Sequence, residues 1–588
     1  MCGRLPAAVL TLFVLLASGC TVSEGASAAK ELRMNLVRVD PPNPRVGELV
    51  TVHLGLAGSW GTPFWQEEIA LDAEVSGPAG MQWSVPGFYT ADCEMGRNND
   101  GNPSPRVTGT PEWQIRIMPE TEGHYQVALC ARDATGQAAE KTVTFTVGSG
   151  ERRPFIRVSQ SDPHYFEFDD GRPYFPNGEN VTWYSGAGGI AEYDRWFTKL
   201  AANGGNLARV FLCEWAFGYE WGKPGEYRLD RAWEVDHIVR LAEEKGIYLI
   251  LSGEYFLRLE GNNPYWRGNG GPCESVEDFF RNEQAERMWR NRLRYAVARW
   301  GYSPNIIAWE LWNEIDNVRP YDREVVGAWQ EGMSRYLHRI DAHRHLVTSS
   351  LQSFSVEPEL WRMPEMSLSQ FHVYYHPSWT PSQFATDMVK AVTYPVPLLR
   401  RYEKPCLVGE YGLVNEEWYE GEMARADPGG VHLHNAIWSA VMAGCAGAPL
   451  GFGWQVYKDD AAIWQQHRPI ASFARDVQWN KEQFVPFQAW SSSDGIRVLA
   501  LQGNTQTLLW AQNQARTWWN VNHAIPIPSI RDVTIYLPAL NGTSYTVERW
   551  DTQTGEMTNS EETEARHQFV SIWVGDLATD VAFKVKRR

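Results

Sequence analysis

The chain has 588 residues, enough for three or four domains with large buried cores. Hydrophobic residues make up 43% and charged residues 21%, which excludes a disordered, collagenous or coiled-coil chain. The formal net charge is -17 and no basic block occurs, so the sequence argues against nucleic acid as a partner. The 28 Trp residues weakly favour a carbohydrate ligand, because flat aromatic faces suit the C–H faces of sugar rings although large cores use Trp as well.

The N-terminus reads as an export signal. Residues 6–19 form an apolar run behind Arg4 that is too short to cross a bilayer but typical of a secretory signal. Small residues lead into Cys20, a pattern that resembles the lipobox of bacterial lipoproteins, whose cysteine is acylated. We therefore expect a lipoprotein signal over 1–20, a tether over 21–31, and a protein held in the bacterial cell envelope only through this lipid anchor. The alternative is ordinary cleavage that leaves Cys20 as a free thiol.

The remaining cysteines have two possible fates. In an oxidising compartment they form one or two disulfides, for example Cys93 with Cys130, or they stay as buried thiols, as Cys406 and Cys445 in apolar runs would. Neither CxxC nor HExxH occurs, so we expect no zinc site. We expect no other metal and no organic cofactor.

Both flanks of the chain show the short alternating runs of β-sheet proteins. Over 32–147 such runs are broken by Pro and Gly, which predicts an immunoglobulin-like β-sandwich. A second set, separated by Asn-Gly and Thr-Gly turns, predicts a C-terminal β-sandwich over 485–588.

The central segment, 155–484, alternates apolar strands with helices. Eight strands are expected at Tyr174–Asn180, Asn206–Leu212, Ile247–Ser252, Asn305–Trp312, Leu346–Ser350, Ser367–Val373, Cys406–Glu410 and Leu450–Trp454. Helices are expected at about 190–202, 230–245, 275–300, 322–343, 381–402 and 430–445. No GxGxxG turn follows the first strand, so the pattern favours a (β/α)8 TIM barrel over an open doubly wound sheet. The expected fold class is therefore a central barrel flanked by two small β-sandwich domains.

The catalytic residues of such a barrel lie at the C-terminal ends of its strands. Asn-Glu occurs three times in the sequence, but only Asn313-Glu314 closes an apolar strand, on which Glu310, Trp312 and Glu314 are expected to share one face. Glu410 ends another apolar run. Two carboxyl groups that face one cleft are what glycoside hydrolysis requires, whereas either Glu alone would read as a surface residue.

The segment 155–484 resembles the retaining glycoside hydrolases built on a (β/α)8 barrel, and most closely glycoside hydrolase family 5. The resemblance implies that Glu314 is the acid/base and Glu410 the nucleophile. It also covers Arg209, Asn313, His372, Tyr374 and Trp454 as substrate-site residues. Family 5 members usually place a His after strand three, where this chain has Glu254 and Tyr255, so membership of a sister family is the alternative.

The supporting residues have physical roles and structural alternatives. Arg209 would donate two hydrogen bonds to Glu410, or serve as an ion pair elsewhere in the barrel. Tyr374 would also hydrogen-bond Glu410, unless it is a core aromatic. His372 would bind the glycone sugar, Asn313 would bind the sugar 2-OH, and Trp454 would stack beneath the sugar or simply pack at the strand end. Further loop aromatics on the same face are Trp183, Trp215, Tyr255, Trp266, Trp379 and Trp418.

We expect a retaining β-glycoside hydrolase that cleaves poly- or oligosaccharide by double displacement, as an endo-β-glucanase or a mannanase does. Sugar configuration, endo or exo action and oligomeric state all stay open. The alternative is a non-catalytic glycan-binding surface lipoprotein on a barrel that has lost its activity. Only the enzyme needs Glu314 and Glu410 together at strand ends.

Overall fold

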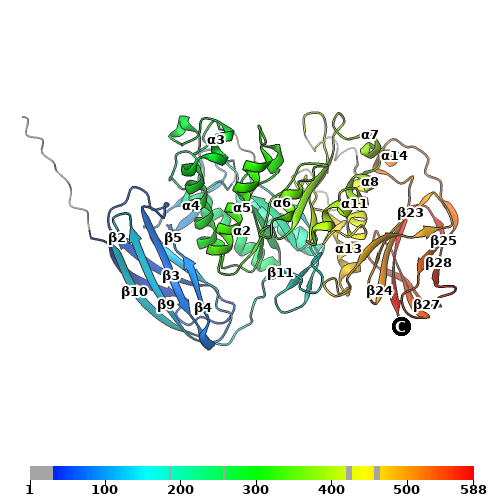
Figure 1. The fold of residues 1–588 in the computed structure, drawn as a ribbon, viewed down its shortest axis with the longest axis horizontal. Coiled ribbons are helices and arrows are strands. Elements are labelled where there is room, and N and C mark those ends of the chain that lie inside the picture. The colour runs from blue at the N-terminus through cyan, green and yellow to red at the C-terminus, as the bar shows by residue number, and fades with distance from the viewer. Residues whose placement is uncertain are drawn as a thin grey trace, which may run out of the picture.

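The protein is described here by a computed structural model that covers residues 31–588, apart from 185–186, 216, 256–258, 419–420, 422–426 and 456–463. The expected export signal and Cys20 therefore lie outside the described residues. Figure 1 shows three bodies in a row: a blue β-structure, a central body of helices and strands, and an orange to red β-structure. Within the described residues, no helix is both long enough and apolar enough to span a membrane.

A small antiparallel sheet of β11 (Ile156–Val158), β12 (Phe166–Phe168) and β13 (Pro173–Tyr174) precedes the barrel, so the strand expected at Tyr174–Asn180 is divided and its barrel part begins at Gly178. The described strands of the barrel itself are parallel and form a closed ring. They are β14 (Gly178–Asn180), β15 (Leu207–Phe211), β16 (Tyr248–Ser252), β17 (Ile306–Glu310), β18 (Leu346–Thr348), β19 (Ser369–Tyr375) and β20 (Cys406–Leu413). Direct pairing runs from β14 to β18 and from β19 to β20. Leu351 bridges to Phe371 between β18 and β19. Gly451 bridges both to Tyr411 of β20 and to Glu179 of β14, so it occupies the position of the eighth strand and completes a (β/α)8 barrel.

Helices follow the barrel strands along the chain. They are α1 (Glu192–Ala202), α2 (Leu229–Lys245), α3 (Val276–Arg281), α4 (Glu283–Trp300), α5 (Arg323–Ile340), α6 (Pro358–Arg362), α7 (Ser382–Ala385), α8 (Met388–Thr393), α9 (Val396–Leu399), α11 (Val431–Met442) and α13 (His467–Ala474). The single helix expected over 275–300 is divided, because Asn282 is extended and its side-chain oxygen accepts bonds from the N–H groups of Gln284 and Ala285, which begins α4. The helix expected over 381–402 is also interrupted, at Pro395 among other points, since proline has no N–H to continue a helix.

The N-terminal body consists mainly of two four-stranded sheets around one core. One sheet has the order β1 (Arg33–Asp40), β2 (Val50–Ala57), β8 (Glu112–Ile117), β5 (Phe88–Thr90). The other has the order β10 (Ala138–Val147), β9 (Gly123–Asp133), β3 (Ile69–Ser76), β4 (Gln82–Pro86). A small hairpin joins β6 (Cys93–Arg97) to β7 (Pro103–Val107). Arg116 of β8 forms an ion pair of 2.9 Å with Asp236 of α2, so this body is attached to the barrel by a partly buried ion pair as well as by packing.

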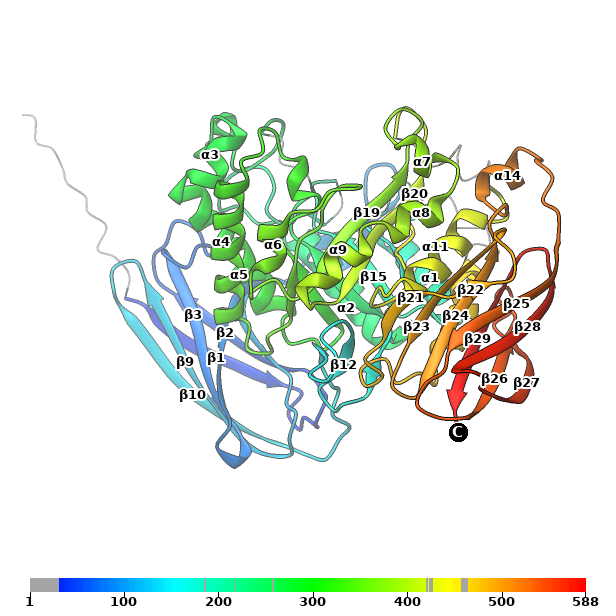
Figure 2. The same cartoon turned by 45° about the vertical axis from the view of Figure 1, so that its right-hand side comes forward.

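The C-terminal body has two sheets that differ in size. The larger has the order β21 (Val485–Gln488), β23 (Ile496–Gln502), β24 (Gln506–Asn513), β29 (Asp580–Arg587), β26 (Ser544–Trp550), β27 (Met557–Glu564). The smaller contains β22 (Trp490–Ser491), β25 (Ile530–Pro538) and β28 (Phe569–Leu577), and the short α14 (Trp518–Asn522) lies between β24 and β25 in the chain. Helix α11 packs against β23 and β24, so the larger sheet lies between the barrel and the smaller sheet (Figure 2).

The six cysteines of the described residues are free thiols. Cys93 and Cys130 are not bridged, since they lie on β6 and β9 with their sulfur atoms near different groups, the Leu229 carbonyl and the Glu140 carboxylate. The other alternative holds for Cys406 and Cys445, which are buried.

Candidate active site

A cavity of about 450 Å³ opens at the C-terminal ends of the barrel strands. Its wall is formed by Tyr255, Asn313, Glu314, Asn317, Gln352, Ser353, Phe354, Tyr374, His376, Trp379, Thr380, Glu410, Val414, Trp418 and Phe452. Four of the residues expected at the site, Asn313, Glu314, Tyr374 and Glu410, are therefore on the wall. The cavity lies where a barrel of this class places its chemistry.

Glu314 reaches the cavity through a break in the strand. Strand β17 ends at Glu310, and Glu314 has a left-handed backbone with φ of +48°. The expected period-two face of Glu310, Trp312 and Glu314 is therefore wrong. Trp312 is fully buried and its ring lies 5.7 Å from that of Trp289 on α4, so it belongs to the packing between strand and helices. The N–H of Glu314 donates to Ser350 Oγ at 2.9 Å, which holds the turn.

Glu410 is held by two donors. Arg209 Nη1 donates at 2.5 Å to Oε1 of Glu410, and the Tyr374 hydroxyl donates at 2.6 Å to Oε2. Arg209 was expected to give two bonds to Glu410, but it gives two to Glu310 instead, both of 2.6 Å. The reason is position: Glu310 is the last residue of β17 and lies beneath the cavity, within reach of the guanidinium fork. Arg209 thus joins a carboxylate on the cavity wall to one below it.

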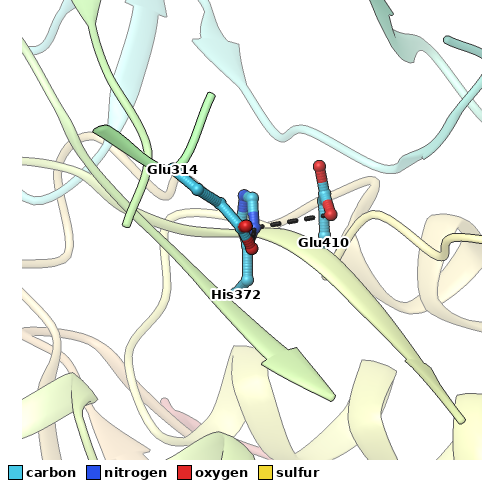
Figure 3. Close-up of side chains that lie close together, drawn as sticks. All are labelled: Glu314, His372 and Glu410. Carbon is cyan, nitrogen blue, oxygen red and sulfur yellow. Dashed lines mark hydrogen bonds and ion pairs between the residues drawn. The ribbon is translucent and has the colours of Figure 1, made fainter. Parts of the chain in front are cut away.

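His372 lies between the two cavity carboxylates (Figure 3). Its Nδ1 is 2.8 Å from Glu314 and 3.4 Å from Glu410, and the ring has no exposed surface. Burial lowers the pKa of His372 to about 4, so the ring is neutral near pH 7. We expected His372 to bind a sugar, but it is not part of the cavity wall and its ring contacts Glu314 instead.

Asn313 is oriented by Arg209. The guanidinium donates to Oδ1 of Asn313 at 2.7 Å, so the amide nitrogen is the end left for the cavity. An amide N–H₂ at this place can donate to a ligand hydroxyl. Asn180 also helps to position Arg209, because its Oδ1 accepts a bond of 3.2 Å from Nη1.

One oxygen of Glu314, one oxygen of Glu410 and one nitrogen of His372 all lie within 4.8 Å of one another. Such a group of donors can also bind a metal ion, but the permanent positive charge of Arg209 is already bonded to Glu410 and would repel a cation there. The distance matters for carbohydrate chemistry. Retaining enzymes hold their carboxyl groups about 5–5.5 Å apart, whereas inverting enzymes need about 6.5–9.5 Å to fit a water.

The environment of Glu314 favours its protonated form. Burial and the nearby charge of Asp316 raise the pKa of Glu314 to about 7. Asn317 donates to its Oε2 at 3.3 Å and opposes that rise. Glu314 can therefore hold a proton near neutral pH, while Glu410 accepts hydrogen bonds from Arg209 and Tyr374.

Trp454 does not lie on the cavity wall. It is 2% exposed, its Nε1 donates to the Trp183 carbonyl at 3.1 Å, and its ring centroid lies 5.2 Å from that of Phe452, which is on the wall. The packing alternative describes it better. The wall also includes Gln352 and Ser353, which the sequence argument missed although they lie two and three residues after the end of the predicted strand 346–350.

Four of the six expected loop aromatics line two cavities, whereas Trp183 and Trp266 line neither of them. Trp379 and Trp418 line the one described above, with ring centroids 5.3 Å apart, and Tyr255 lines both. Trp215 lines the second cavity, of about 650 Å³. Glu254, at the position where family 5 usually has a His, faces this second cavity and is paired with Arg292 at 3.1 Å.

Comparisons with known proteins identify relatives of the barrel. No family model matches the chain. Mannan endo-1,4-beta-mannosidase 4 of Oryza sativa subsp. japonica is 30% identical over 217 residues, 33% of this chain and 45% of that protein. Mannan endo-1,4-beta-mannosidase 3 of the same plant is 25% identical over 351 residues, 51% of this chain and 73% of that protein. The chain spans about half the length of the first curated relatives it matches.

A solved structure matches nearly the whole chain. It is the crystal structure of a "putative glycoside hydrolase from Bacteroides vulgatus ATCC 8482", with a TM-score of 0.60, 13% identity, and coverage of 93% of this chain and 100% of that chain. At this identity the likeness is one of fold. Together with the sequence relatives, it confirms the resemblance to the barrel glycoside hydrolases of family 5 that the strand-end motifs predict.

Proposed function

We propose that the chain is a retaining β-glycoside hydrolase that works by double displacement. The observation that carries the proposal is the pair of carboxylates, Glu314 and Glu410, with oxygens within 4.8 Å of each other in one cavity. This close approach is in keeping with the short carboxyl separation of retaining enzymes, about 5–5.5 Å, rather than the wider one of inverting enzymes, about 6.5–9.5 Å.

In the first step, Glu410 attacks the anomeric carbon and Glu314 gives its proton to the leaving oxygen, so a glycosyl ester forms and the aglycone departs. Arg209 and Tyr374 hold and orient Glu410 for this attack. Glu314 supplies the proton, because its pKa is raised to about 7 and the carboxyl group is therefore protonated below that pH. Asn313 would donate to the sugar 2-OH, a bond that strengthens in the transition state.

In the second step, Glu314 is a carboxylate and takes a proton from water. The water oxygen then attacks the anomeric carbon, and Glu410 leaves as a carboxylate. The hydrogen bond from His372 to Glu314 favours the ionised state that this step needs if Nδ1 carries the proton. Two inversions at one carbon retain its configuration.

We propose a β-1,4-mannan as the substrate and endo action as the mode of cleavage. The support comes from the sequence relatives, which are named mannan endo-1,4-beta-mannosidases. The cavity supports a polysaccharide as well, because Trp379 and Trp418 extend its wall with rings that are 67% and 45% exposed. Such rings can stack on further sugars beyond the cleaved bond.

The test is hydrolysis of a panel of soluble polysaccharides, with galactomannan, glucomannan, carboxymethyl cellulose and xylan as substrates. We expect the galactomannan and glucomannan to be cut into mixed oligosaccharides, with early loss of viscosity as endo cleavage requires. Glu314→Gln and Glu410→Gln should each abolish the activity, while Glu283→Gln, a surface control on α4, should leave it unchanged. Activity of Glu410→Gln equal to that of the parent would contradict the proposal.

The non-catalytic alternative makes the opposite prediction. A glycan-binding protein on an inactive barrel would bind the same polymers without any product, and its binding would not need the proton on Glu314. The geometry favours the enzyme, because Arg209, Tyr374 and His372 hold both carboxylates in place. Binding of a sugar alone does not require two carboxylates in a fixed arrangement.

We also propose that 32–147 and 485–588 are separate domains, immunoglobulin-like and β-sandwich respectively, on either side of a barrel at 155–484. The two-sheet cores of the flanks support this division. We further propose export with acylation at Cys20, on the signal pattern alone. Cys20→Ala should then move the protein from the membrane fraction to the soluble fraction, and an unchanged distribution would contradict acylation.

A further inference from the structure

The outer sheet of the C-terminal body carries a cluster of exposed aromatic rings. Trp490 on β22, Tyr536 on β25 and Phe569 and Trp573 on β28 are 58%, 39%, 37% and 69% exposed. Trp490 pairs directly with Tyr536, and its ring centroid is 5.6 Å from that of Phe569. Tyr536 is paired with Ser571, so Phe569 and Trp573 flank it on the same face. We call these four residues the aromatic strip.

The aromatic strip lies on the side of the molecule away from the barrel. Residues of β25 and β28 that point the other way, such as Ile535 and Ile572, are buried in the core shared with the larger sheet. That larger sheet packs in turn against α11 of the barrel. Figure 2 shows β25 and β28 at the outer edge, with β24 and β29 between them and α11. The strip is therefore separate from the catalytic cavity and open to solvent.

The segments that carry the rings hold no charged side chain, and the charged residues of the same two strands, Arg531, Asp532 and Asp576, lie beyond one end of the strip. Residues 534–538 and 569–573 contain no acidic or basic side chain, although the chain has a net charge of -17. The positions between the rings are Thr534 and Ser571, whose hydroxyls can hydrogen-bond. A neutral ligand with hydroxyl groups matches this surface, whereas an anionic membrane would be repelled by the charge of the whole protein.

The strip is too small for a stable protein interface. Two inter-strand spacings and the four-residue rise from Phe569 to Trp573 give it an extent of roughly 10 by 14 Å. A stable protein complex covers about 800 Å² on each partner, several times that area. A single extended sugar chain, by contrast, needs only a narrow row of flat rings.

We propose that the aromatic strip is a second carbohydrate site, which binds a neutral polysaccharide chain by stacking of sugar rings on Trp490, Tyr536 and Trp573. Binding here holds the polymer near the protein and raises its effective concentration at the barrel cavity. The inference goes beyond the proposed hydrolase activity and does not depend on it, since binding at the strip needs no chemistry at Glu314 or Glu410.

The test is affinity electrophoresis in native gels that contain galactomannan, glucomannan or neutral mixed-linkage β-glucan. The parent for this experiment is the Glu410→Gln variant, which leaves the polymer intact. We expect at least one neutral polymer to retard it, and the double substitution Trp490→Ala and Trp573→Ala to weaken that retardation about tenfold. Trp573→Phe keeps a ring and should retain most of the binding. Tyr394→Ala, a ring 52% exposed on another surface, is the matched control.

Several outcomes would overturn the inference. Among them are no retardation by any of the three polymers, equal retardation of the parent and the double variant, and equal loss in Tyr394→Ala. A strip-dependent dimer, or flotation with phosphatidylcholine vesicles, in the absence of polymer binding would assign the strip to another partner. Thermal unfolding confirms that each variant is folded. In the active protein, turnover of a short oligosaccharide should be the same with and without the strip, which separates this inference from the proposed hydrolase.

Discussion

Arg209 donates two hydrogen bonds of 2.6 Å to Glu310 and one of 2.5 Å to Glu410. One guanidinium therefore serves two carboxylates, of which Glu410 lines the cavity and Glu310 lies beneath it, 1% exposed. Glu310 also raises the pKa of Glu314 through its negative charge. It can thus influence the reaction without touching the substrate, as a positioning residue.

Glu310→Gln tests this role. The substitution keeps the shape of the side chain but removes a negative charge that raises the pKa of Glu314. The alkaline limb of kcat/KM should therefore move to lower pH, because the catalytic acid would lose its proton earlier. The measurement is a pH profile on glucomannan, with Glu283→Gln as the surface control. A limb that stays in place or moves upward would refute the role given to Glu310.

The pH dependence of the parent should reflect Glu314 directly. Its pKa is raised to about 7, chiefly by burial and next by Asp316, and the acid must be protonated to act. We expect kcat/KM to fall as the pH rises through about 7. Asp316→Asn removes the second cause and should shift that fall to lower pH. An identical profile for Asp316→Asn would mean that another group is the acid.

The free energy of unfolding should also depend on pH through Glu314, and it should fall as the pH rises. A carboxyl whose folded pKa lies above its unfolded value stabilises the fold at low pH, and this contribution is lost as the pH rises from 4.5 through about 7. Glu314→Gln cannot ionise at this position. Its free energy of unfolding, relative to that of the parent, should therefore be higher at pH 8 than at pH 5, by at most roughly 3 kcal/mol. Urea unfolding at both pH values measures this. An equal difference at the two pH values would count against the raised pKa.

Tyr374→Phe removes the hydroxyl that donates at 2.6 Å to Glu410. We expect kcat to fall about 10- to 100-fold with little change in stability, since one charge-stabilising hydrogen bond at the nucleophile is lost. Tyr375→Phe is a matched control, because that neighbouring ring lies 4.9 Å from Trp518 and is not part of the cavity wall. If both variants lost the same activity, the effect of Tyr374 would be one of packing only.

The strand order of the barrel could be predicted from the sequence because apolar runs and helical periodicity are local signals. The strand-end rule then placed Asn313, Glu314 and Glu410 on one cavity wall. Two of the three Asn-Glu pairs were set aside on the same rule. Asn282 indeed caps helix α4, where its side chain has a structural task.

The remaining details depend on contacts that no local pattern contains. The period-two rule failed at Trp312 because the strand stops at Glu310, and the residues from there to the left-handed Glu314 no longer alternate as strand residues do. The partner of Arg209 could not be read from the sequence, since Glu310 and Glu410 are both on strands and only the three-dimensional arrangement decides. For the same reason the sequence did not reveal that Phe452, and not Trp454, lines the cavity.

The central claim is double displacement by Glu410 and Glu314, and proton NMR of fresh product tests it most directly. Hydrolysis of a β-linked manno-oligosaccharide in D₂O should first give the β-anomer, which then mutarotates, because two inversions retain the configuration at the anomeric carbon. The close approach of the two carboxyl groups, with one oxygen of each within 4.8 Å of the other, supports this expectation. An initial α-anomer would show single displacement and contradict the account.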